Sequence, residues 1–155
     1  MIEKAFTMGN GWRGRKNGMR IVVIDGQGGG IGKSLVEQIK RELPTEEILV
    51  IGTNAVATSN MLRAGADFGV TGENAIVYNC KRADIIVGPI GILLTNGLMG
   101  EITSKMAEAI SDSDAQKVLI PVSKCPVQVA GVQEMPVGKY VEQAVVRIKD
   151  FIDQN

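Results

Sequence analysis

Short runs of apolar residues recur along the chain, and stretches with a helical hydrophobic period lie between them. The first run, Ile21–Ile24, is short and β-branched, which is typical of a buried strand. It is apolar at every position, as expected for a strand covered on both faces of a parallel sheet. By the same criteria we predict strands at about residues 21–24, 47–51, 68–70, 85–87 and 117–122, and an edge strand at 127–132.

Helices are predicted between these strands. Ile31, Leu35 and Ile39 recur every four residues, and Pro44 ends that stretch. Either Thr53 or Asn54 is a suitable N-cap for the next helix. We expect the helices at about residues 31–43, 55–64, 74–82, 98–110 and 140–152.

This alternation predicts an α/β fold: a single doubly wound, mainly parallel, Rossmann-like sheet of five to six strands. Right-handed crossovers place the carboxyl ends of parallel strands at one edge of the sheet. The loops that follow the strands should therefore share one crevice, where such sheets bind ligands. These loops cover residues 25–32, 52–54, 71–74, 88–97 and 123–126.

Length and charge limit the alternatives. The 155 residues suit one domain, which we expect at residues 19–155, after a disordered basic extension at residues 1–18. The basic and acidic residues balance overall, but residues 1–20 hold five basic side chains and one acidic one. The remainder is therefore acidic and has no basic stripe, which argues against nucleic acid as a partner.

Other features bear on location and cofactors. The only two cysteines, Cys80 and Cys125, make a poor disulfide framework, so a cytoplasmic protein is expected. The longest uncharged run, at residues 85–100, is broken by Pro89 and several glycines, so no membrane span is expected. The sequence contains no histidine, the commonest metal ligand, and we expect no metal site.

The most informative stretch directly follows the first strand. Five glycines fall within seven positions, and a helical pattern begins immediately after them: Gly26, Gly28, Gly29, Gly30 and Gly32. Glycine lets backbone N–H groups approach an anion closely, and a helix N-terminus adds unpaired donors and a positive dipole end. Strand, glycine turn and helix together predict a phosphate-binding loop.

Three motifs compete for this loop. The strict dinucleotide pattern G-x-G-x-x-G fails, because its third position is Ile31. A looser G-x-x-x-G-I-G pattern fits and resembles the turn of short-chain dehydrogenases, but the chain lacks their Tyr-x-x-x-Lys pair. The end of a P-loop fits at Gly32–Ser34, but Gln27 replaces its first glycine, and no later strand ends in an acid that could hold magnesium.

The candidate binding residues each have a structural alternative. Asp25 could contact a ligand or bond the amides of the turn itself. Thr53, Asn54 and Glu73 are as readily explained as helix caps, and Cys125 as an inert buried thiol. The complete candidate set is Asp25, Gly26, Gln27, Gly28, Gly29, Gly30, Ile31, Gly32, Lys33, Thr53, Asn54, Glu73, Asn74, Gly88, Pro89, Thr95 and Asn96.

Several of these motifs together resemble a known family. They are the glycine turn, Gly52–Ala55, Ala64–Ala66, Thr71–Ile76 and Gly88–Gly91. From about residue 19 to residue 132, the chain resembles a family of small bacterial proteins that is described as a domain of unknown function. The resemblance implies a Rossmann-like fold and a bacterial cytoplasm, and it supplies no catalytic residues.

The leading hypothesis is a domain that binds a nucleotide or another phosphorylated small molecule, in a sensory or regulatory role. The sequence does not identify a cofactor; NAD(P) and other nucleotides are candidates, and we expect the phosphate of such a ligand on the amides of residues 28–33. A second hypothesis is an oxidoreductase-like or transferase enzyme that uses Asp25, Glu73 or Cys125 in the same crevice. A third is a homo-oligomer or interaction module that associates through the apolar residues 90–94.

Overall fold

The computed structural model describes residues 18–122 and 126–155. Most of the expected basic extension therefore lies outside the described residues, and the division at residue 18 stays a prediction. Strands and helices alternate along the chain in the order β1 (Ile21–Asp25), α2 (Gly30–Glu42), β2 (Ile48–Gly52), α3 (Ala55–Arg63), β3 (Phe68–Thr71), α4 (Glu73–Cys80), β4 (Ile85–Pro89), the 3₁₀ helix η2 (Ile90–Leu93), α5 (Ser104–Asp112), β5 (Gln116–Ile120) and α6 (Val137–Gln154).

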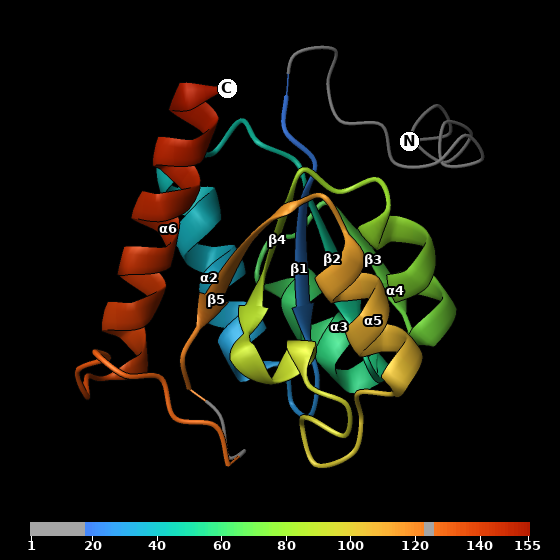
Figure 1. Cartoon of the computed structure of the whole chain (residues 1–155). Helices are drawn as coiled ribbons and strands as arrows, with labels where there is room; N and C mark the ends of the chain where they lie inside the picture. Colours follow the sequence, from blue (N-terminus) through green and yellow to red (C-terminus); the bar gives the residue numbers. More distant parts are fainter. Residues whose placement is uncertain (1–17, 123–125) are drawn as a thin grey trace, which may run out of the picture.

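The strands form one parallel sheet in the order β3-β2-β1-β4-β5 (Figure 1). From β1, the strands β2 and β3 extend the sheet in one direction, and β4 and β5 extend it in the other. The order therefore reverses between β1 and β4, which makes their carboxyl ends the topological switch point. The predicted α/β class and doubly wound parallel sheet are confirmed.

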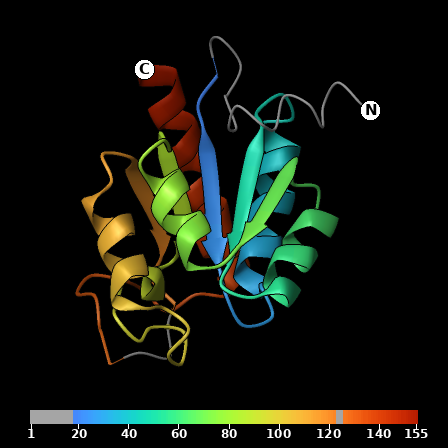
Figure 2. The same ribbon diagram turned by 90° about the vertical axis from the view of Figure 1, so that its right-hand side faces the viewer.

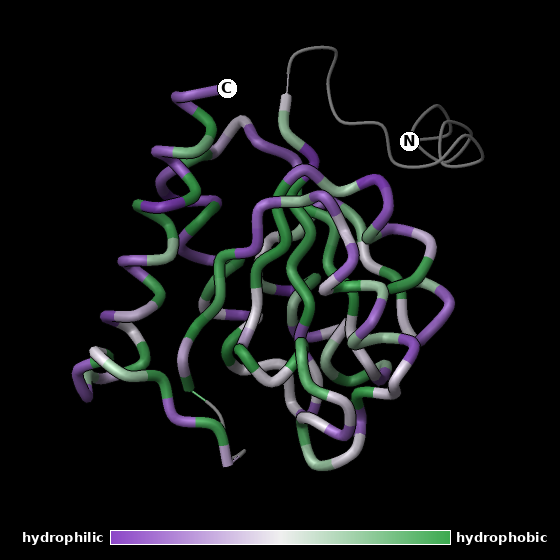
Figure 3. The backbone as a smooth tube through the Cα atoms, in the orientation of Figure 1, coloured by the Kyte–Doolittle hydropathy of each residue, from purple (hydrophilic) through white to green (hydrophobic). Residues whose placement is uncertain are grey.

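Helices cover both faces of the sheet (Figure 2). Two apolar clusters fill the two interfaces between the sheet and these helices. Ile21 and Val23 of β1 belong to the cluster under α2, α3 and α6, whereas Val22 and Ile24 belong to the cluster under α4 and α5. Successive strand residues point to opposite faces, so a strand between two helical layers must be apolar throughout. Figure 3 shows this as hydrophobic strands at the centre of the molecule.

Two sequence predictions about elements are wrong. The helix expected from about residue 98 begins only at Ser104, because Leu98 and Met99 adopt positive φ angles of 55° and 58° and Thr103 caps the helix. The edge strand expected at 127–132 is not formed, and Gly131 turns that segment with a φ of 85°. Within the described residues the sheet therefore has five strands rather than six.

None of the helices in the described part of the chain is long and apolar enough to cross a membrane.

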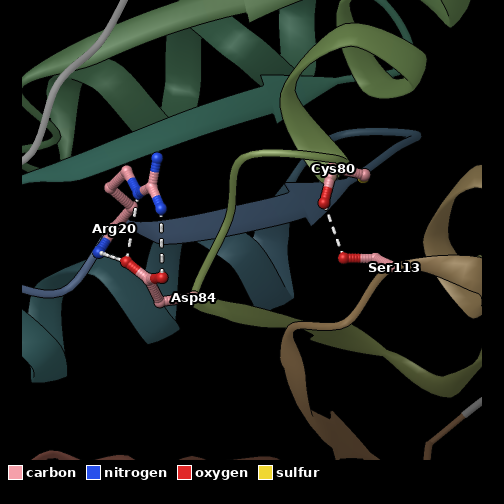
Figure 4. A network of polar contacts seen from close by, with 4 residues as sticks. All are labelled: Arg20, Cys80, Asp84 and Ser113. Carbon is pink, nitrogen blue, oxygen red and sulfur yellow. Dashed lines mark hydrogen bonds and ion pairs between the residues drawn. The ribbon is translucent and has the colours of Figure 1, made fainter.

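A polar contact joins β1 and β4 at the end of the sheet opposite the crevice, where Arg20 precedes β1 and Asp84 precedes β4 (Figure 4). The Asp84 carboxylate accepts a hydrogen bond from the Arg20 backbone N–H at 2.8 Å and another from Nε at 3.1 Å. Nearby, the Ser113 hydroxyl donates to the Cys80 carbonyl at 2.6 Å and so links the last turn of α4 to the residue after α5.

Cys80 itself is a structural residue. Its side chain is completely buried in the cluster under α4 and α5. Burial raises the pKa of its thiol to about 12, against a small opposing effect of Lys117. The thiol is therefore protonated at neutral pH and does not act as a nucleophile.

The Arg20–Asp84 pair predicts a pH-dependent contribution to stability. Burial alone would raise the pKa of Asp84, but the hydrogen bonds and charge of Arg20 outweigh it and hold that pKa below its ordinary value. The contribution is therefore complete above the pKa of the unfolded state and is lost as pH falls through the folded-state pKa. Asp84→Asn should reduce the free energy of unfolding by about 1 kcal/mol at about pH 7 and by much less at about pH 3.

Urea denaturation of both proteins at the two pH values measures this difference. Asp114→Asn is the matched control, because Asp114 is exposed and makes no hydrogen bond or ion pair with the described residues. An equal loss of stability at both pH values would contradict the prediction.

Candidate functional site

A cavity opens at the topological switch point of the sheet. Asp25, the last residue of β1, and Pro89, the last residue of β4, both line it. Its volume is about 410 Å³, within the range of small-molecule sites. The other lining residues come from the glycine turn, the connection after β4 and the segment after β5: Gly26, Gln27, Gly28, Gly29, Gly30, Ile31, Asn96, Gly97, Leu98, Met99, Val122 and Pro126.

Asp25 organises the glycine turn from below. Its side chain is only 5% exposed. One carboxylate oxygen accepts from the Gly26 N–H at 2.8 Å and the other from the Gly32 N–H at 2.7 Å. These bonds cap the first turn of α2 with a residue from the end of β1, so the strand and the helix are joined across the turn.

The electrostatics of Asp25 follow from this position. Burial raises its pKa, the amides of Gly32 and Gly26 lower it, and the negative charge of Glu101 raises it again. The net shift is upward, but both oxygens are engaged with backbone amides. The structure thus assigns Asp25 the turn-stabilising role that was one of its two predicted alternatives.

The carbonyl groups of the turn are also held by neighbouring residues. The Asn54 side chain donates to the Gln27 carbonyl at 2.9 Å, and the Asn60 side chain donates to the Gly28 carbonyl at 2.8 Å. Asn54 follows β2 and Asn60 lies on α3, so both bonds fix the turn from the β2 side of the sheet. Asn60 is absent from the sequence-derived candidates, since a single polar residue in a helix gives no sign of a distant partner.

In the turn, the Ile31 N–H interacts with the Asp25 carboxylate, whereas the N–H groups of Gly28 and Gly30 have no acceptor among the described residues. Their directions follow from peptide geometry, because the C=O and N–H of a trans peptide point in opposite directions. The Gln27 carbonyl points at Asn54, so the Gly28 N–H points away from β2. The Gly29 carbonyl accepts from Lys33 N–H, so the Gly30 N–H points out of the N-terminus of α2.

Glu101 is the main residue that the sequence analysis missed. It lies in the connection between β4 and α5, and its carboxylate accepts from the Gln27 N–H at 3.0 Å and 3.1 Å. The same carboxylate accepts from the Thr53 hydroxyl and, at 3.1 Å, from the Asn54 side chain. Burial raises the pKa of Glu101, but these three donors outweigh it and hold the pKa below its ordinary value.

Glycine at position 26 makes this approach possible. A Cβ added there would lie 2.7 Å from Glu101 Oε2 and 2.5 Å from Thr53 Oγ1. At Gly32, an added Cβ would lie 2.3 Å from the sulfur of Met61 on α3. A Cβ at either of these two glycines would displace neighbouring side chains, whereas Gly28 and Gly30 have open space beside them.

Comparison with known proteins identifies the family of this chain. The sequence model of one family, described as "Domain of unknown function (DUF3842)", matches residues 20–153. The chain belongs to the DUF3842 family. The match extends beyond the resemblance noted from the motifs and includes most of α6. None of the curated proteins matches this DUF3842 chain.

One of the solved structures that the chain matches is the dodecameric FMN-dependent UbiX-like decarboxylase from Escherichia coli O157:H7. The identity is 17% and the TM-score 0.42, over 87% of this chain and 94% of that one. A similarity at this level does not extend to ligand, activity or assembly.

The remaining candidates of the DUF3842 chain are more dispersed than predicted. Asn54 caps α3 by accepting from the Ala57 N–H at 2.9 Å, as its structural alternative proposed. Glu73 begins α4 and accepts from the Thr103 hydroxyl at 2.6 Å. Neither residue lines the cavity, and the same is true of Gly32, Lys33, Thr53, Asn74, Gly88 and Thr95.

The structure limits the number of donors that the turn offers to an anion. Of the amides at 28–33, those of Gly29, Gly32 and Lys33 bond within the protein and that of Ile31 interacts with the Asp25 carboxylate, so an anion has fewer donors than the sequence suggested. Cys125 lies outside the described residues. Within residues 18–122 and 126–155 no group of three or more acidic or cysteine side chains is arranged to hold a metal ion.

The bonds of Asp25 predict its effect on stability. Asp25→Ala leaves the buried N–H groups of Gly26 and Gly32 without acceptors, so it should lower the free energy of unfolding by about 2 to 4 kcal/mol. Asp25→Asn keeps one acceptor oxygen and should cost less. Urea denaturation measures both, with the exposed Asp114→Ala as control. A loss for Asp25→Ala no larger than that of the control would contradict this role.

Proposed function

We propose that this DUF3842 domain binds a phosphorylated small molecule, of which a nucleotide is the leading class, in the cavity at the switch point. The observation that supports this proposal is the pair of N–H groups at Gly28 and Gly30, which have no acceptor among the described residues and belong to a turn that lines the cavity. A bound phosphate would accept from these two groups.

The N-terminus of α2 favours an anion. This helix has 13 residues, no acidic residue in its first turn and no side-chain cap on its N-cap residue, Gly29. Asp25 bonds to this positive dipole end from the sheet side, and it is the one acid among the described residues that line the cavity. The Gly30 N–H points out of the helix at the same end. Lys33 is exposed one turn further along α2 and adds a positive charge to that part of the helix.

The rest of the cavity suits the uncharged part of such a ligand. Apolar side chains of Ile31, Leu98 and Val122 line it together with Pro89, and Asn96 adds a polar group. An anion site at one end and apolar walls elsewhere are typical of sites for phosphorylated organic molecules. A base or another flat apolar group would contact these walls.

Binding without catalysis agrees best with the described side chains. Asp25 is the one ionisable side chain among the lining residues, and both its oxygens accept from backbone amides. Glu73, the other described acid proposed for catalysis, is outside the cavity. We therefore propose a sensory or regulatory role, in which the bound ligand is recognised rather than converted.

A charge added at position 30 tests the anion site directly. An added Cβ meets nothing within 4 Å there, and an acidic residue in the first turn of a helix is tolerated by the fold. Gly30→Asp should weaken the binding of any phosphorylated ligand by at least about tenfold, because its carboxylate takes the position of the phosphate. Gly30→Asn has almost the same shape without the charge and should weaken binding much less.

Isothermal titration calorimetry with AMP, GMP, ATP, GTP, coenzyme A, NAD and NADP measures these affinities. Melting temperatures of the two variants show whether both remain folded. The proposal fails if no compound in this panel binds the unaltered protein, or if Gly30→Asp and Gly30→Asn bind equally well.

A further inference from the structure

The connection between β4 and α5 crosses the carboxyl end of β1. It begins beside the cavity, where Asn96 to Met99 form part of the wall. It then passes over Gly26, where an added Cβ would lie 2.9 Å from Leu98 Cδ1. Finally Glu101 reaches Thr53 and Asn54, which follow β2 on the other side of the glycine turn.

The base of this connection is held by hydrogen bonds within it. The Asn96 N–H donates to the Ile102 carbonyl at 2.7 Å, and the Ile102 N–H donates to the Gly97 carbonyl at 3.1 Å. Ile102 is completely buried in the cluster under α4 and α5. We call residues 98–101, which project from this base, the strap.

The tip of the strap is fixed by Glu101. Its carboxylate accepts hydrogen bonds from the Gln27 N–H of the glycine turn and from the side chains of Thr53 and Asn54, which follow β2. Leu98 packs against the same core cluster as Ile102. One apolar contact and one carboxylate therefore hold the strap across the turn, on the side of β1 that faces β2.

That side is where a dinucleotide would place its first nucleoside. In dinucleotide-binding sheets of this kind, an acid about 20 residues beyond the glycine turn accepts from the adenosine ribose, at the end of the second strand. Here the second strand ends in Gly52 and is followed by the neutral Thr53 and Asn54. Their polar groups, which could have contacted a ribose, are bonded to Glu101 instead.

We infer that the strap, through Glu101, determines the ligand class of the proposed site: it closes the half next to β2 and admits phosphorylated ligands with at most one nucleoside. This inference rests on the proposed function. A mononucleotide can occupy the cavity on the β4 side with its phosphate at Gly28 and Gly30. A dinucleotide needs both halves, and its first nucleoside, on the β2 side, meets Glu101.

The experiment compares the unaltered full chain with Glu101→Ala. Calorimetry gives the dissociation constants of AMP, GMP, UMP, CMP and NAD for both proteins. The unaltered protein should bind at least one mononucleotide at least about tenfold more tightly than NAD. Glu101→Ala should reduce that ratio by at least about tenfold through tighter NAD binding, because the half next to β2 opens. The matched control is Glu108→Ala, an exposed acid on α5, which should leave the ratio unchanged.

A ligand-independent measurement accompanies these titrations. Amide hydrogen exchange at Gln27 should be slow in the unaltered protein and faster in Glu101→Ala, because Glu101 is the acceptor of that N–H. Equal exchange in the two proteins would show that the strap is not closed in solution, and would overturn the inference.

The titrations separate failure of the inference from failure of the proposed function. If a mononucleotide binds but Glu101→Ala leaves the ratio to NAD unchanged, only the inference fails. It also fails if Glu101→Ala weakens NAD binding, because Glu101 would then be an acceptor for the ribose. If no compound binds either protein while Gln27 is protected, the proposed function fails and the inference fails with it.

Discussion

The pair of hydrogen bonds from Gly26 and Gly32 to the Asp25 carboxylate is the contact on which the site depends. It joins the end of β1 to the first turn of α2 and so sets the path of the glycine turn between them. A helix N-terminus has unpaired N–H groups that need acceptors, and a buried carboxylate needs donors. In this protein the N–H groups and the Asp25 carboxylate satisfy one another. Burial of the carboxylate costs desolvation free energy, and the raised pKa of Asp25 reflects that cost.

Most amides of the turn donate hydrogen bonds within the protein. Those of Gly26 and Gly32 donate to Asp25, that of Gln27 donates to Glu101, and that of Gly29 donates to a carbonyl of the turn itself. A turn rich in glycine is therefore not automatically an open anion site, because the close approach that glycine permits also serves internal carboxylates. What distinguishes Gly28 and Gly30 is the direction in which their peptide units face, together with the open space beside them.

The strap shows how a connecting loop can alter a common fold. The β1–α2–β2 part of this chain has the strand and helix order of a dinucleotide-binding unit. The long connection after β4 adds a carboxylate from another part of the chain at the place where such units meet a ribose. Function in α/β sheets is decided in these loops, whereas the sheet mainly positions them.

The amino-acid sequence by itself determined the class of fold, the parallel sheet and the position of the glycine turn. These follow from local signals: apolar runs such as Ile21–Ile24, helical periodicity such as Ile31, Leu35 and Ile39, and glycine spacing. The same local reasoning failed at Leu98, where an apolar residue at helical spacing lies in a loop with positive φ.

Only the tertiary structure decided which residues meet at the site. Glu101 is 74 positions from Gln27 and 48 from Thr53, and no local pattern encodes contacts over such separations. The structure likewise decided that Asp25 bonds to amides of the turn and that Gly28 and Gly30 line the cavity. These outcomes depend on where the β4–α5 connection crosses the sheet, because hydrogen-bond partners are chosen by proximity in space rather than along the chain.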